Sequence, residues 1–148
     1  MSGVEFRVEV DGLEATQARL QELLQRMGDL TPVMDEIGAY LRDSTDERFE
    51  TGTGPDGQAW KPSIRALAEG GQTLVDSSLL RKSITWRARR DSVEVGSNLD
   101  YAAIHQMGGK AGRNHAVTLP ARPYLGISPD DEREIGAILD DYLSGAVQ

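Results

Sequence analysis

The chain has 148 residues and a mass of 16.1 kDa, enough for one compact domain and too little for two independent cores. It contains no cysteine, which excludes disulfides, thiolate zinc sites and cysteine nucleophiles. The formal net charge of −8 argues against a free-standing DNA-binding protein, because such proteins neutralise phosphates with Lys and Arg. No stretch approaches the roughly 20 apolar residues of a membrane helix. We therefore expect a single soluble domain over residues 1–148, without a signal segment or a membrane partner.

The N-terminal third predicts a strand followed by two helices. Apolar and charged residues alternate from Val4 to Val10, which is the period of a strand with one buried face. Apolar residues then recur at helical spacing from Leu13 to Met27. Thr31 suits the N-cap of a second helix and Pro32 suits its first position, so we expect this helix from about Pro32 to Phe49.

The middle of the chain predicts a loop, a short helix and a hairpin. Glycine and proline crowd the segment from Thr51 to Pro62, which cannot continue the preceding helix. Asp76 is expected to cap a short helix that runs through Lys82. Two strands, Ile84 to Ala88 and Val93 to Val95, are expected to pair across Asp91-Ser92. On the first of them, alternation predicts that Trp86 points into the core.

The C-terminal third predicts a brief helix from Tyr101 to His105, a break at Gly108-Gly109 and then a mobile basic loop. A stiff extended arm follows from Pro120 to Leu125, because each proline fixes its own φ and extends the residue before it. The last helix is expected from Ser128-Pro129 to about Gly145, with acidic residues in its first turn. Together these elements predict an α+β fold: a small, mainly antiparallel sheet with two N-terminal helices and a C-terminal helix packed on it.

The segment from Gly52 to Gly57 matches the pattern G-x-G-x-x-G. A dinucleotide fingerprint must follow a strand and open a helix, so that the pyrophosphate meets the helix N-terminus. Here the pattern follows a charged helix and leads into Trp60-Lys61-Pro62. We interpret it as a glycine-rich turn and expect no cofactor.

The chain has two histidines, His105 and His115, and neither lies in a pattern typical of a metal site or a nucleophile elbow. We expect His105 to be structural, with its ring beside Tyr101 and hydrogen-bonded to the backbone. No catalytic residue is assigned. The alternative that stays open is a small hydrolase in which His105 acts with Asp100 or Asp76.

Six residues are candidates for contacts between subunits. The basic residues of the predicted hairpin strand form a solvated face, a contact for an acidic subunit, or a surface that meets DNA in an assembled channel. Glycines flank the basic loop, which can order on binding. The arm presents an arginine at small entropic cost, while its tyrosine also anchors the last helix. These candidate subunit-contact residues are Arg87, Arg89, Lys110, Arg113, Arg122 and Tyr124.

Several separated motifs occur in a characteristic order. The run V-x-V-G-S-N-x-x-Y-A-A-I-H-Q-x-G-G begins at Val93, and L-P-A-R-P-Y-L-G-x-S begins at Leu119. Upstream are Arg48-Phe49, Ala59-Trp60-Lys61 and the segment from Leu79 to Ile84. This order, which covers most of the chain, resembles the phage virion morphogenesis family, the Mu G-like tail-completion proteins of contractile-tailed phages.

The resemblance implies a structural virion assembly protein that needs no cofactor and acts in tail completion or head-tail joining. It implies several copies in a ring around the tail axis, in contact with tail tube, terminator or neck proteins. The implied locations are the virion and, during assembly, the host cytoplasm, with nucleic acid contact at most incidental in the assembled channel. The alternative within the same fold is a prophage-derived adaptor domain with another protein partner.

Overall fold

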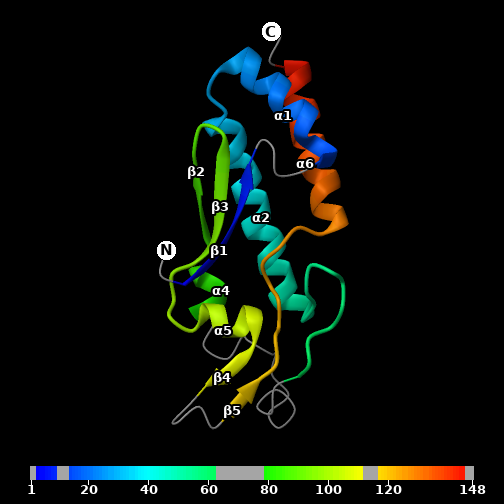
Figure 1. Cartoon of the computed structure of the whole chain (residues 1–148). Coiled ribbons are helices and arrows are strands. Elements are labelled where there is room, and N and C mark those ends of the chain that lie inside the picture. The colour runs from blue at the N-terminus through cyan, green and yellow to red at the C-terminus, as the bar shows by residue number, and fades with distance from the viewer. Residues whose placement is uncertain (1–2, 10–13, 63–78, 112–116, 146–148) are drawn as a thin grey trace. The chain divides into compact units, whose positions relative to one another are not determined.

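The computed structural model describes residues 3–9, 14–62, 79–111 and 117–145, and it has an α+β fold (Figure 1). In chain order the described elements are β1 (Val4–Glu9), α1 (Glu14–Met27), α2 (Thr31–Thr51), α4 (Leu79–Ser83), β2 (Thr85–Ala88), β3 (Ser92–Ser97), α5 (Ala102–Met107), β4 (Gly109–Ala111), β5 (Val117–Leu119) and α6 (Pro129–Gly145). The predicted fold class is confirmed. Among the described residues, no helix is both long and apolar enough to cross a lipid bilayer.

The residues cluster into two compact units, each built from three chain segments. The first unit comprises Met1–Glu5, Ser44–Ile84 and Gly96–Gly126. The second unit comprises Phe6–Asp43, Thr85–Val95 and Ile127–Gln148. Whether the chain behaves as one domain stays a prediction, to which the Discussion returns.

The main sheet has the strand order β1-β3-β2, and every residue of the central strand β3 is buried. Arg89 N donates to Ser92 O at 2.8 Å, which closes the predicted hairpin between β2 and β3. On the other side, a Cβ added to Gly96 would lie 2.1 Å from Val4 O, while Glu94 pairs with Arg7 further along β1. Residue numbers therefore increase along β1 while the numbers of the facing residues on β3 decrease, so this pairing is antiparallel as well.

A second, two-stranded sheet lies where the sequence predicts a mobile basic loop. Strands β4 and β5 pair antiparallel, with Gly109 opposite Leu119 and Lys110 opposite Thr118. The loop prediction is therefore wrong for the residues of β4. Each strand has only three residues, which is too short for alternation to stand out against the flanking glycines.

The second unit has its core between helices and the inner face of the sheet. Helices α1 and α6 pack together, and Arg19 Nε meets Asp140 Oδ1 at 3.0 Å on their surface. Helix α2 approaches β2 so closely that a Cβ on Gly38 would lie 2.4 Å from the Trp86 ring, so Trp86 faces α2, but it is half-buried and not part of the buried core predicted for it. Met27, predicted to belong to the apolar stripe of α1, is instead 36% exposed at the end of that helix. The fully buried side chains of this unit include Val8, Leu20, Leu23, Leu30, Val33, Met34, Ile37, Leu41, Val93, Ile135 and Leu139.

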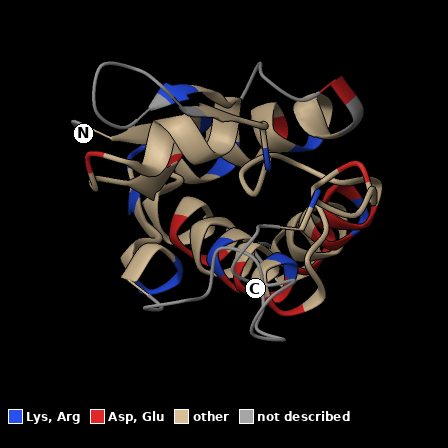
Figure 2. Cartoon of the chain, turned by 90° about the horizontal axis from the view of Figure 1, so that it is seen from below, with Lys and Arg blue, Asp and Glu red and all other residues tan. Residues whose placement is uncertain are grey.

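The helix starts show how well local sequence signals work. At α6, Asp131 N donates to Ser128 Oγ and Ser128 N donates to Asp131 Oδ2, each at 3.0 Å, which forms the predicted cap with a reciprocal bond. At α2 the cap differs from the prediction, because Thr31 donates from N and Oγ1 to Asp29 Oδ1 at 2.9 and 2.6 Å. These bonds lower the pKa of Asp29. Acidic residues such as those that open α6 are red in Figure 2, and basic residues are blue.

Candidate functional site

The Pro120 to Leu125 arm is fastened to the first unit through its main chain. Gln106 on α5 accepts hydrogen bonds at Oε1 from the amides of Tyr124 and Leu125, at 3.0 and 2.9 Å. Its Nε2 donates to Leu125 O at 3.0 Å. One side chain thus satisfies three main-chain groups of a segment that lies outside the helices and strands.

Two more side chains bind carbonyl oxygens in and beside the arm. Arg48 Nη1, from α2, donates to Tyr124 O at 2.7 Å and to Gly126 O at 3.2 Å. Trp60 Nε1 donates to Pro123 O at 2.7 Å. The path of the arm is therefore held by contacts with residues far away in the sequence.

Tyr124 belongs to a buried aromatic cluster centred on Phe49. Its ring lies 5.4 Å from that of Phe49, which in turn meets Trp60 edge-on at 5.7 Å. Tyr124 is 0% exposed, its hydroxyl donates to Ala102 O at 2.6 Å, and burial raises its pKa. The expectation that Tyr124 lies on an exposed contact surface is wrong, because the ring fills the core of the first unit.

Arg122 is also buried, with only 6% of its surface exposed. Its Nε donates to Lys61 O at 2.7 Å, and its main-chain N donates to His105 O at 2.9 Å. The arm therefore does not hold this guanidinium out from the surface as expected, and the role of Arg122 in a subunit contact stays a prediction. The prolines predict the arm's stiffness, but they carry no information about which distant segment packs over Arg122.

The basic residues of the hairpin lie in the second unit and are exposed. The side chain of Arg87, on β2, has neither an ion pair nor a hydrogen bond with any residue that the structure describes. Arg89 Nε lies 3.6 Å from Glu94 Oε1, and Arg7 Nη2 lies 2.7 Å from the same oxygen. Glu94 has only 7% of its side chain exposed, so two half-exposed arginines flank a buried carboxylate. The outer face of this sheet therefore offers the charge of Arg87 to a partner.

Lys110 lies in the first unit on strand β4, where its exposed side chain makes no ion pair with the described part of the chain. Arg113 falls outside the described residues. The structure thus divides the predicted contact residues: Arg87 and Arg89 share one surface in the second unit, whereas Lys110 belongs to the first unit.

His105 packs beside Tyr101 as predicted, with the two rings 5.8 Å apart and nearly perpendicular. The predicted hydrogen bond from the ring is not found at Nδ1, which is buried and has no partner. Burial lowers the pKa of His105, and the positive charge of Arg122 lowers it further. Within the described ranges, no group of three His, Asp or Glu side chains could hold a metal ion. His115 and Asp76 lie outside those ranges.

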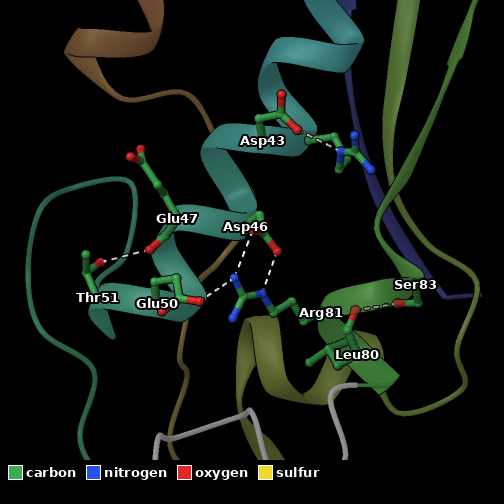
Figure 3. A network of polar contacts seen from close by, with 9 residues as sticks. Asp43, Asp46, Glu47, Glu50, Thr51, Leu80, Arg81 and Ser83 are labelled. Atoms are coloured by element: carbon green, nitrogen blue, oxygen red, sulfur yellow. Dashed lines mark hydrogen bonds and ion pairs between the residues drawn. The ribbon is translucent and has the colours of Figure 1, made fainter.

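Sequence reasoning missed an ion-pair network that ties α4 to α2 (Figure 3). Arg81 bonds both carboxylate oxygens of Asp46, with Nε at 2.5 Å and Nη2 at 2.9 Å, and its Nη2 also lies 2.6 Å from Glu50. This pairing raises the pKa of Arg81. Acids at positions 46 and 50 share one face of a helix, which is a visible signal, but their partner lies 35 residues away from Asp46.

Comparisons with known proteins agree over nearly the whole chain. The model of the phage virion morphogenesis family matches residues 11–144. The chain is 36% identical to "Mu-like prophage FluMu G protein 2" of Haemophilus influenzae, over 93% of this chain and 96% of that protein. It is 32% identical to "Putative capsid assembly protein G" of Escherichia phage Mu, over 88% of this chain and 92% of that protein. No solved structure matches. The chain belongs to the phage virion morphogenesis family.

Proposed function

We propose that this protein is a structural component that acts in tail completion or head-tail joining during phage assembly. The observation that carries the proposal is the family match over residues 11–144, supported by a relative named as a capsid assembly protein. Several copies arranged around the tail axis would contact tail tube, terminator or neck proteins. The protein would be found in the virion and, during assembly, in the host cytoplasm.

The surface of the second unit supports a role in protein contacts. Arg87 carries an unpaired positive charge on a protein with a formal net charge of −8, so acidic surfaces are the natural partners of the β2 face. Arg89 lies beside it and is only loosely paired with Glu94 at 3.6 Å. Lys110 and Arg113 would extend such contacts from the first unit.

Deletion of the gene from an active phage tests this function. We expect heads and tails to accumulate separately, because a joining component acts between two pathways that otherwise finish independently. Electron micrographs of the lysate would show this, and expression of the parent chain from a plasmid should restore joined particles. Normal infectious particles from a clean deletion would contradict the proposal.

A further inference from the structure

The guanidinium of Arg122 is held in place, but no carboxylate in the described part of the chain neutralises it. Its Nε is fixed by Lys61 O at 2.7 Å, and its main chain is fixed by His105 O at 2.9 Å. No carboxylate among residues 3–9, 14–62, 79–111 and 117–145 forms an ion pair with it, although only 6% of the residue is exposed. Buried arginines are normally paired, because removing an uncompensated charge from water is costly.

Arg81, in the same unit, shows the usual arrangement. Its side chain is 19% exposed and is paired with Asp46 and Glu50. Arg122 is more deeply buried and has one bond, to a neutral carbonyl, so its two Nη groups have no acceptor in the described part of the fold. These groups are not among the fully enclosed atoms without a partner, which are Thr16 Oγ1 and His105 Nδ1. They therefore stay within reach of a group that approaches from outside.

His105 provides a second incomplete group beside Arg122. The two residues are linked through the main chain, and Nδ1 of His105 is enclosed without a hydrogen-bond partner. The charge of Arg122 is close enough to lower the pKa of His105. The positively charged Nη groups of Arg122, which have no acceptor in the described part of the fold, favour an anion.

We propose that the guanidinium of Arg122 is a binding site for a carboxylate side chain of a second copy of this chain. The planar fork of a guanidinium fits a carboxylate with two parallel hydrogen bonds, which a lysine cannot reproduce. This inference rests on the proposed assembly function and names a contact within it.

The chain itself supplies the required acid. It has 24 acidic and 16 basic residues, so a second copy carries more acidic than basic groups. Helix α6 alone exposes Glu132, Glu134 and Asp141, which form no ion pair within the described part of the chain. These exposed acids and the buried cation, which has no counter-charge in the described part of the chain, are complementary between two copies.

The test replaces Arg122 with methionine, which keeps the length and removes the charge. Because no described residue of the free chain compensates the cation, the Arg122→Met protein should melt at or above the temperature of the parent. Its self-association, measured by sedimentation velocity over a wide concentration range at low salt, should weaken on the order of 30-fold, the loss typical of truncating a buried interface arginine. Arg90→Met is the matched control, since Arg90 also donates Nε to a carbonyl, Gly28 O at 2.7 Å, but is exposed. It should keep the association of the parent.

Three results would overturn the inference. A melting temperature of Arg122→Met well below those of the parent and Arg90→Met would mean that the fold already compensates the charge. Unchanged association, or a parent that stays monomeric at every concentration, would mean that a second copy does not supply the carboxylate. The deletion phenotype is independent of these outcomes, so separated heads and tails together with unaffected association would retain the function and reject the site.

Discussion

His105 shows how one side chain connects burial, charge and stability. Its ring is half-buried, it packs against Tyr101, and its pKa is lowered first by burial and then by Arg122. In the unfolded chain the same imidazole titrates near its ordinary value of 6.5. Just below that pH, the unfolded chain therefore binds more protons than the folded protein. Proton binding then favours the unfolded chain, so the folded state loses stability as the pH falls.

We accordingly expect the free energy of unfolding to fall as the pH drops from about 7.5 through 6.5, where the unfolded imidazole binds its proton. The decrease should stop below the folded pKa of His105. Urea unfolding at a series of pH values measures this slope, and His105→Gln, which cannot titrate, should flatten it. An equal slope in that variant would mean that other groups cause the pH dependence. A hydrolytic activity abolished by the same substitution would instead support the enzyme alternative.

At the scale of elements, the arm depends on the Gln106 side chain of α5. Gln106→Leu would leave two amides and one carbonyl of Tyr124 and Leu125 without their partners. An unsatisfied group costs about 1 to 3 kcal/mol, and partial access of water reduces that cost, so we expect a loss of about 2 to 4 kcal/mol in unfolding free energy. Gln25→Leu on the exposed face of α1 is the control and should stay within about 0.5 kcal/mol. Denaturant titration measures the unfolding free energy of both variants. Equal stability of the two would mean that the hydrogen bonds of Gln106 do not hold the arm in place.

The elements that sequence could predict are those encoded locally. Alternation gives β1, helical spacing gives α1 and α2, and Ser128-Pro129 with the following acids gives the start of α6 within one residue. The β4–β5 pair could not be predicted, because three-residue strands are too short to show a period of two. The site was predicted only in part: the stiffness of the arm is local, whereas the burial of Arg122 depends on Lys61, 61 residues away. Local patterns contain no information about such partners.

At the scale of the whole molecule, the chain passes repeatedly between its two units. The boundaries between units fall inside β1, α2 and β3, so a single helix or strand contributes residues to both units. Separate unfolding of one unit would require each of these three elements to break in its middle, with loss of the hydrogen bonds that make elements cooperative. This continuity favours one cooperative transition and supports the prediction of a single domain.

The two tryptophans provide a direct test, because Trp60 belongs to the first unit and Trp86 to the second. Trp60 is 6% exposed against Phe49, and Trp86 donates Nε1 to Asp35 at 2.8 Å, so unfolding should change the emission of each ring. Trp60→Phe leaves a reporter only in the second unit, and Trp86→Phe leaves one only in the first. Within each variant, the urea midpoint from fluorescence should coincide with the midpoint from far-ultraviolet circular dichroism, which follows all the helices. A fluorescence transition that precedes or follows the loss of helix in either variant would show that the two units unfold separately, as two domains.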